Sequence, residues 1–288
     1  MENFKNIIRK IFKIKNNYLR RVLFDYSTLK IFNYKCTLYF SKKDNNELSN
    51  LCEKYMTNKG YNLSQLKDES FDLGYYQNYD DYYSEIFSLN KSKIQNVFEL
   101  GIGTTDSTNH YNMNFLGKKY SPGASLRVWR DYFINANIFG ADIDKNVLFS
   151  EDRITTYWVD QLNKESIINM YKNFGVEKFD IIIDDGSHNV KDQILTLSAF
   201  ITKLKKGGTY VIEDINQYTV FPELNSDNLK NGVKSFLKTI NRDSIKIPEC
   251  LTIEESKNIK NNIKKVFFEK GKFIYKNKNI SDIVFLQK

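Results

Sequence analysis

The chain has 288 residues, of which 41% are hydrophobic and 15% aromatic, which argues against global disorder. Its formal net charge of +8 favours an anionic partner such as a nucleotide diphosphate, an acidic glycan or a membrane surface. Because the basic residues are spread along the chain without an arginine-rich tract, nucleic acid is not expected as the partner.

The three cysteines, Cys36, Cys52 and Cys250, are widely spaced and form no CxxC pair. This pattern argues against a disulfide framework or a zinc site and is typical of a reducing cytoplasm. No apolar run approaches the roughly 20 residues of a transmembrane helix. Charged residues such as Lys5 and Arg9 interrupt the start too early for a signal peptide. We therefore expect a cytoplasmic protein.

The pattern of residues 1–24 predicts a basic amphipathic helix, in which lysines and arginines alternate with an apolar face. Such a helix can lie on an anionic bilayer as a peripheral membrane contact. The commoner outcome is packing on its own domain or on a second subunit of a homo-oligomer, and these alternatives stay open. The apolar positions are Phe4, Ile7, Ile8, Ile11, Leu19 and Val22.

A second helix is predicted over residues 44–60, with Gly60 as its terminator. A tyrosine-rich stretch follows, and such clusters can stack on sugar or base rings, although most are core. We expect residues 1–92 to form an N-terminal helical cap segment and residues 93–288 an α/β domain. The tyrosines are Tyr75, Tyr76, Tyr79, Tyr82 and Tyr83.

Residues 96–100 (NVFEL) are a buried-strand candidate that leads into Gly101 and Gly103. An acidic residue such as Glu99 inside an apolar strand, followed by GxG, is typical of a nucleotide-binding fold, where the glycines let the backbone approach the ligand. The third glycine of GxGxxG is replaced by Asp106, so the motif is incomplete.

The next helix is predicted to begin near Ser125 (SLRVWRDYF), after a connection that contains His110 and Pro122. Connections between strands and helices usually have about 2–6 residues, whereas this one has about twenty. Its length predicts a lid or a substrate-binding loop.

Two further strands are predicted over residues 137–143 and 155–159. The first ends at Asp142, where a carboxylate can accept both ribose hydroxyls of an adenosine. The second is followed by Asp160 and Gln161, a pair that can bind an adenine amino group.

The centre of the chain, residues 179–218, predicts a strand, a helix and a second strand. The first apolar run ends in Asp184 and Asp185, and the second ends in Glu213 and Asp214. The helix is predicted over residues 190–204, with Gly207 and Gly208 closing it. If the strands are parallel neighbours, their terminal carboxylates converge at the sheet edge where open α/β folds bind ligands.

Carboxylates this close together repel one another unless a cation neutralises them. An all-oxygen cluster suits Mg²⁺ or Mn²⁺ rather than zinc. His188, three residues after Asp185, is placed to accept a proton near neutral pH.

The remaining pattern predicts a helix over residues 227–240, a hairpin of strands 265–268 and 273–275, and a final strand at 283–286. The fold class is therefore α/β, a doubly wound Rossmann-like sheet of seven mostly parallel strands with an antiparallel edge hairpin and an N-terminal helical segment.

Over residues 96–218 the motifs ELGIG, SLRVWRDYF, GADI, VDQ, FDIIIDDGSH and GGTYVIED resemble the class I S-adenosylmethionine-dependent methyltransferases. Among these they are most similar to the metal-dependent macrolide-sugar O-methyltransferases of the mycinamicin and macrocin type. Residues 54–60 (KYMTNKG) resemble that family's KYGTDKG, with Met56 and Asn58 in place of Gly and Asp.

The resemblance implies S-adenosylmethionine and Mg²⁺ or Mn²⁺ as cofactors. It implies Asp185, Glu213 and Asp214 as metal ligands, and His188 with Asp185 as catalytic residues. For the cofactor it implies residues around the methionine part, then Asp142 at the ribose, and Asp160 and Gln161 at the adenine. The residues implied at or near the methionine part of the cofactor are Glu99, Gly101, Gly103, Ser125, Arg127 and Asp184.

We therefore expect an O-methyltransferase that acts on a sugar hydroxyl, with a nucleotide-linked sugar of a bacterial surface polysaccharide as the substrate. Three alternatives stay open. One is a phenolic, catechol or phosphoryl-linked acceptor. Another is a nucleic-acid methyltransferase, which the lack of an NPPY-like motif disfavours. The last is a non-catalytic nucleotide-binding scaffold, which the retained acidic cluster disfavours.

Overall fold

The computed structural model describes residues 30–31, 34–35, 46–60, 77–109, 112–225, 229–240, 247–275 and 278–288. The helix predicted over residues 1–24 lies outside the described residues, so its membrane or subunit contact stays a prediction, and Tyr75, Tyr76 and His110 also lie outside. In the described ranges, no helix combines the length and the apolar character needed to cross a bilayer.

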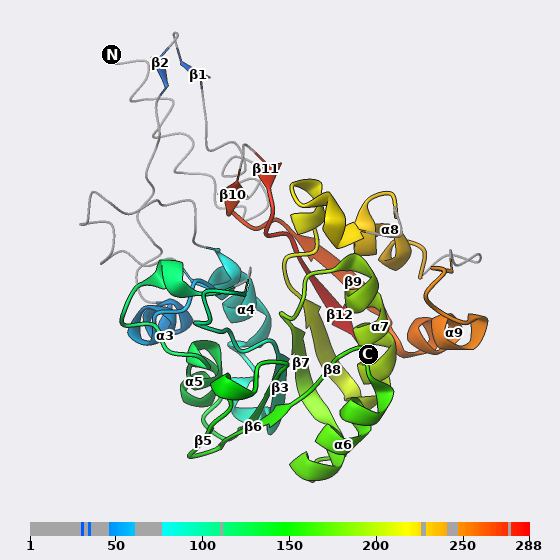
Figure 1. Ribbon diagram of the computed structural model, residues 1–288, viewed down its shortest axis with the longest axis horizontal. Coiled ribbons are helices and arrows are strands. Elements are labelled where there is room, and N and C mark those ends of the chain that lie inside the picture. The colour runs from blue at the N-terminus through cyan, green and yellow to red at the C-terminus, as the bar shows by residue number, and fades with distance from the viewer. Residues whose placement is uncertain are drawn as a thin grey trace. The chain divides into compact units, whose positions relative to one another are not determined.

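Contacts divide the chain into two units, residues 1–44 and residues 45–288. In the first, the described residues form the antiparallel pair β1 (Lys30–Ile31) and β2 (Tyr34–Lys35). In the second, the described residues form a sheet with the strand order β5-β6-β4-β3-β7-β8-β12-β9 (Figure 1). The boundary predicted at residue 92 stays a prediction, but residues 46–60 and 77–92 belong to the second unit.

Five consecutive strands of the sheet, from β6 to β8, are parallel, and β12 runs antiparallel to both β8 and β9. The predicted fold class is confirmed. The sheet differs from the prediction at both edges: the two-residue strand β5, which was not predicted, pairs with β6, and residues 273–275 do not join the sheet. The strands are β3 (Asn96–Leu100), β4 (Asn137–Asp142), β5 (Ser150–Glu151), β6 (Ile154–Trp158), β7 (Phe179–Asp184), β8 (Leu204–Ile212), β9 (Lys265–Glu269) and β12 (Ile283–Gln287).

Helices cover both faces of the sheet (Figure 1). Side chains of β7 alternate between two cores: Ile181 and Ile183 pack into one, and Ile182 packs into the other. The first core is closed by α3 (Glu47–Tyr55), α4 (Tyr79–Phe87) and α5 (Ala124–Tyr132). The second is closed by α6 (Lys164–Phe174), α7 (Val190–Phe200), α8 (Gly232–Leu237) and α9 (Ile253–Asn262).

Three predicted details are corrected by the structure. Helix α7 ends at Phe200, and Gly207 and Gly208 lie inside β8, where the positive φ of Gly207 (80°) accommodates an irregular register. Strand β9 pairs with β12 rather than with residues 273–275. Those residues contribute β10 (Ile274–Tyr275), which pairs with β11 (Lys278–Asn279).

The reason for the changed pairing lies at Gly271. A Cβ there would lie 1.9 Å from the carbonyl oxygen of Ser281, so the backbone segments at 271 and 281 pack directly on each other. Asn279 Nδ2 also donates to the Gly271 carbonyl at 2.7 Å. The described residues 271 and 279–281 therefore pack on each other, and the chain re-enters the sheet at Ile283 beside Glu269.

Candidate active site

The structure brings together side chains from the carboxyl ends of β7 and β8. The two strands are parallel neighbours, with Asp184 paired to Ile212, so that Asp185 and Asp214 leave the sheet at the same edge. The predicted convergence of the two acidic segments is confirmed. One ligand atom each from Asp185, His188 and Asp214 lies within 4.8 Å of the others.

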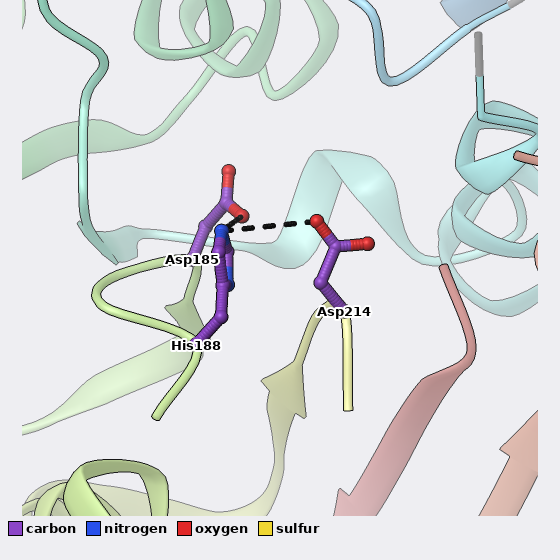
Figure 2. Close-up of side chains that lie close together, drawn as sticks. All are labelled: Asp185, His188 and Asp214. Atoms are coloured by element: carbon purple, nitrogen blue, oxygen red, sulfur yellow. Dashed lines mark ion pairs between the residues drawn. The ribbon is translucent and has the colours of Figure 1, made fainter. Parts of the chain in front are cut away.

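Dashed lines join His188 to both carboxylates in Figure 2. Its Nε2 is 3.9 Å from Asp185 Oδ1 and 3.8 Å from Asp214 Oδ2. Its side chain is 10% exposed, and that of Asp185 is 25% exposed. The imidazole thus faces two acceptors and keeps limited access to solvent, as a group that exchanges protons with a substrate requires.

Both His188 and Asp214 have left-handed backbone conformations, with φ of 55° and 53°. Such conformations are uncommon for residues other than glycine, and they cluster at functional sites where surrounding contacts hold them in place. Here they turn the side chains after β7 and β8 toward each other.

Asp214 is 5% exposed, and its oxygens are held by three donors. Gln77 Nε2 lies 3.0 Å and the Tyr79 hydroxyl 2.6 Å from Oδ1, and Gln217 Nε2 lies 2.9 Å from Oδ2. Burial raises the pKa of Asp214, an effect that the nearby His188 opposes. The donors fix the orientation of the carboxylate before any ligand arrives.

Lys59 lies in the middle of the acidic side chains. Its Nζ is 2.7 Å from Asp185 Oδ2, 2.5 Å from Glu213 Oε2 and 3.2 Å from Glu99 Oε1. Although burial disfavours the charge, these carboxylates hold the pKa of Lys59 well above its ordinary value. The residue is 3% exposed, so its ammonium is a permanent part of the cluster.

Glu213, predicted as a metal ligand, is fully buried. Its Oε2 faces Lys59, and its Oε1 accepts a hydrogen bond from the Tyr83 hydroxyl at 2.5 Å. Burial, and next the charge of Asp185, hold the pKa of Glu213 well above its ordinary value. A cluster that raises the pKa of its own carboxylates is one that a cation stabilises.

Glu99 is buried at the same place, at the end of β3. Its Oε2 accepts hydrogen bonds from Ser125 Oγ at 2.7 Å and Trp129 Nε1 at 3.0 Å. Ser125 thus contacts Glu99 from the start of α5, and its role at the cofactor stays a prediction.

The turn after β3 is built from two glycines with positive φ, 83° at Gly101 and 80° at Gly103. A Cβ at Gly101 would lie 2.0 Å from the Asp185 carbonyl oxygen, so this turn packs directly on the loop that carries Asp185 and His188. At Gly103 the nearest neighbour of a Cβ would be the Tyr120 hydroxyl, on the long connection before α5. The glycine turn and the acidic cluster therefore share one edge of the sheet.

Asp142 ends β4 next to this turn, as predicted. Its Oδ2 accepts the Ile102 N–H at 2.9 Å and its Oδ1 the Asp144 N–H at 2.9 Å. Burial raises its pKa. Asp142 therefore shapes the backbone of the turn.

Other predicted cofactor residues line the neighbouring loops. Gln161 lies beside Gly186 and donates to Thr196 Oγ1 at 3.2 Å, and Asp160 Oδ1 accepts the Leu162 N–H at 3.0 Å. Asp184 is 1% exposed, and burial raises its pKa to about 8. The burial of Asp184 thus favours the neutral form of its carboxyl group.

Arg127 is engaged elsewhere. Its Nη2 lies 2.6 Å from Glu151 Oε1, and its guanidinium stacks over the Phe149 ring at 4.5 Å. These contacts tie α5 to β5, which the sequence had not predicted. The cofactor role of Arg127 stays a prediction.

The groups that sequence reasoning missed come from residues 46–60 and 77–87, here called the cap helices. They supply Lys59, Gln77, Tyr79 and Tyr83 to the carboxylates. Lys59 belongs to the KYMTNKG stretch, and both tyrosines belong to the aromatic cluster, but neither pattern specifies a carboxylate partner. Met56 has a left-handed conformation (φ 59°) at the end of α3, the position where the resembled family has glycine.

The fold is the Rossmann-like methyltransferase fold. Among solved structures, the chain is similar to the MycE methyltransferase of mycinamycin biosynthesis in complex with Mg and SAH. The TM-score is 0.55, with 23% identity over 84% of this chain and 54% of that chain. No family model matches the chain.

Curated relatives confirm the resemblance to sugar O-methyltransferases. One is the 8-demethyl-8-alpha-L-rhamnosyl tetracenomycin-C 2'-O-methyltransferase of Streptomyces olivaceus, 29% identical over 55% of this chain and 39% of that protein. A second is the mycinamicin VI 2''-O-methyltransferase of Micromonospora griseorubida, 29% identical over 59% of this chain and 36% of that protein. A third is the demethylmacrocin O-methyltransferase of Streptomyces fradiae, 38% identical over 32% of this chain and 23% of that protein. The chain thus spans about two fifths or less of the length of these relatives.

Proposed function

We propose that this protein is an S-adenosylmethionine-dependent O-methyltransferase that acts on a sugar hydroxyl with the assistance of a divalent metal ion. The observation that carries the proposal is the meeting of Asp185, His188 and Asp214 beside the glycine turn at Gly101. A proton acceptor and two carboxylates at that edge of the sheet are what transfer of a methyl group to a hydroxyl oxygen requires.

The residues present fit a divalent metal ion. Carboxylate oxygens from Asp185 and Asp214 are the ligands that Mg²⁺ and Mn²⁺ prefer, and Asp214 is oriented by its own hydrogen bonds. Glu213 is the third proposed ligand, since carboxylate oxygens can accept more than one partner. When bound, the ion supplies positive charge that lowers the pKa of an acceptor hydroxyl.

The residues also fit S-adenosylmethionine, which when bound supplies a methyl group on a sulfonium. Gly101 and Gly103 carry no side chain over the turn, and the conformation of both is one that other residues rarely adopt. We assign Glu99, Gly101 and Gly103, with Ser125, Arg127 and Asp184, to the methionine side. Asp142 is assigned to the ribose, and Asp160 and Gln161 to the adenine.

His188 is the proposed general base. Its Nε2 takes the proton of the acceptor hydroxyl, and the resulting imidazolium lies between the carboxylates of Asp185 and Asp214, which stabilise its charge. General-base assistance contributes about 10²–10⁴-fold in rate. The orientation of the acceptor oxygen toward the methyl group is the second contribution to the rate.

A sugar acceptor is supported by the names of the relatives, of which the tetracenomycin enzyme is named for a rhamnosyl compound. Two kinds of sugar substrate remain to be compared: a nucleotide-linked sugar, which the net charge of +8 favours, and a glycosylated small molecule. We propose the nucleotide-linked sugar, with a surface polysaccharide as its destination.

The test is methyl transfer from labelled S-adenosylmethionine with Mg²⁺ to nucleotide sugars, rhamnosides and catechols. We expect the label to be transferred to a sugar. Excess EDTA should abolish this transfer, and added Mg²⁺ should restore it. Transfer to the rhamnosides alone would replace the nucleotide-linked acceptor. Transfer to catechols without any sugar, or full activity in EDTA, would refute the proposal.

A further inference from the structure

The buried ammonium of Lys59 lies among three carboxylates, which are also the ligands that divalent ions such as Mg²⁺ prefer. An ammonium has three N–H donors, and Lys59 Nζ lies within 3.2 Å of three carboxylates from three different strand ends. Neutral donors also bind two of those carboxylates: Ser125 and Trp129 bind Glu99, and Tyr83 binds Glu213.

We propose that Lys59 is a positioning residue that takes the place of a second metal ion, so that the acidic cluster holds one divalent cation rather than two. This inference rests on the proposed function, because it concerns the same metal site.

The two oxygens of Asp185 indicate the two cation positions. Oδ2 lies 2.7 Å from Lys59 Nζ, and Oδ1 is directed toward His188 and Asp214. One carboxylate therefore bridges the fixed ammonium on one side and the proposed metal position on the other. Two-metal sites use clustered oxygen ligands to hold a pair of ions about 3.5–4 Å apart. Here a side chain fills one half of such an arrangement.

The charge count supports the same conclusion. Glu99, Asp185, Glu213 and Asp214 supply four carboxylates, and Lys59 supplies one buried ammonium in contact with three of them. A buried ion pair adds little to stability on average, because the loss of hydration offsets the attraction. A gain in stability therefore does not explain this cluster. A role of the ammonium in limiting the cluster to one divalent ion does explain it.

The substitution Lys59→Met removes the charge and keeps most of the side-chain volume. Three carboxylates would then face a position without a cation, and we expect a second divalent ion to enter. Lys59→Arg keeps the charge and is expected to bind one ion. Lys54→Met is a matched control from the same stretch, because Lys54 pairs with Asp131 at 2.9 Å away from the cluster and its side chain is 58% exposed.

The experiment counts Mn²⁺ ions bound per chain by electron paramagnetic resonance, with circular dichroism to verify folding. We expect one ion for the wild type, Lys59→Arg and Lys54→Met, and two ions with a dipolar-broadened signal for Lys59→Met. Methyl transfer by Lys59→Met should fall at least tenfold, because Asp185 is no longer held between Lys59 and His188. If Lys59→Met is unstable, Mn²⁺ should raise its melting temperature more than that of the wild type.

The outcomes separate this inference from the proposed function. A wild type that binds no Mn²⁺ overturns the proposed metal site and the role of Lys59 with it. A wild type that binds one ion, beside a Lys59→Met variant that binds one or none and is not stabilised by Mn²⁺, overturns the role of Lys59 alone. Two ions in Lys59→Arg would also overturn it, because the retained charge should exclude the second.

Discussion

The strand ends bring negative charge to the cluster, whereas the cap helices bring the groups that neutralise or orient it. Asp185, His188, Glu213 and Asp214 follow β7 and β8 within a few residues. Lys59, Gln77, Tyr79 and Tyr83 reach the same carboxylates from 126 to 154 residues earlier in the chain. The comparison teaches that the proposed site residues can be local to two strands while their environment depends on a distant segment of the chain.

The largest expected effect lies on the strand-end side. His188→Ala removes the proposed proton acceptor, and we expect kcat to fall about 10²–10⁴-fold, equivalent to about 3–5 kcal/mol of barrier. Binding of S-adenosylhomocysteine, measured by calorimetry, should stay within about threefold because His188 is assigned no contact with the cofactor. A variant with near wild-type kcat would mean that the proton leaves by another route.

On the cap side, Tyr83→Phe tests whether the cap helices hold Glu213 in place. The change leaves Glu213 Oε1 buried without its donor, and we expect a loss of about 1–3 kcal/mol in the free energy of unfolding. Urea unfolding measures it. The control is Tyr82→Phe. The exposed hydroxyl of Tyr82 donates to the Lys270 carbonyl at 2.7 Å, and its removal should lower the free energy of unfolding by less than about 0.5 kcal/mol. Equal effects of the two variants would contradict the importance of the buried bond.

A smaller effect is expected where the cap joins α5. Although partial burial opposes it, hydrogen bonds from Tyr55, Lys54 and Arg130 hold the pKa of Asp131 below its ordinary value of 3.8. A lowered carboxyl pKa stabilises the fold above the unfolded-state pKa, and the stabilisation is lost as the pH falls toward the folded-state pKa. Asp131→Asn should therefore lower the free energy of unfolding by about 1 kcal/mol near neutral pH. The difference between the wild type and the variant should become smaller below about pH 4.

Urea titrations of the wild type and Asp131→Asn between about pH 7 and about pH 3 measure this gap. A difference that does not change with pH would show that the hydrogen bonds, and not the carboxylate charge, link α3 to α5.

The smallest expected effect is a gain. Met56 ends α3 in a left-handed conformation, which costs a residue with a side chain about 1–2 kcal/mol relative to glycine. Met56→Gly should raise the free energy of unfolding by about 0.5–1 kcal/mol after the entropy of the unfolded glycine is counted. Met56→Ala, which keeps the Cβ, serves as the control and should give no such gain in thermal unfolding.

The strands that end at the proposed site residues were predictable because their signals are local. Residues 96–100 form β3 with the predicted bounds, and the acidic residues after β7 and β8 meet because parallel neighbours end at one edge. Helices α6 and α9 were missed although both have readable caps, Asn163 at α6 and the Thr252–Glu255 capping box at α9.

The environment of the site could not be read from the sequence in the same way. The position of Lys59 depends on how α3 packs beside α5, and no periodicity specifies which carboxylates a lysine will meet. Arg127 shows the same limit of sequence reasoning. It lies two residues after Ser125, but its guanidinium contacts Glu151 on the two-residue strand β5. Pairings between distant segments are decided by packing, which a single sequence does not display.

The distances along the chain between Lys59 and its partners also have a consequence for biosynthesis. A ribosome makes the lysine first, and Asp185 and Glu213 follow 126 and 154 residues later. The positive charge of Lys59 therefore gains its Asp185 and Glu213 partners only after most of the sheet has been synthesised. Long-range closure of this kind slows folding, and the acidic cluster is complete only after β8 and the residues that follow it have been made. A chain released before residue 213 would carry the proposed base without its full set of carboxylates.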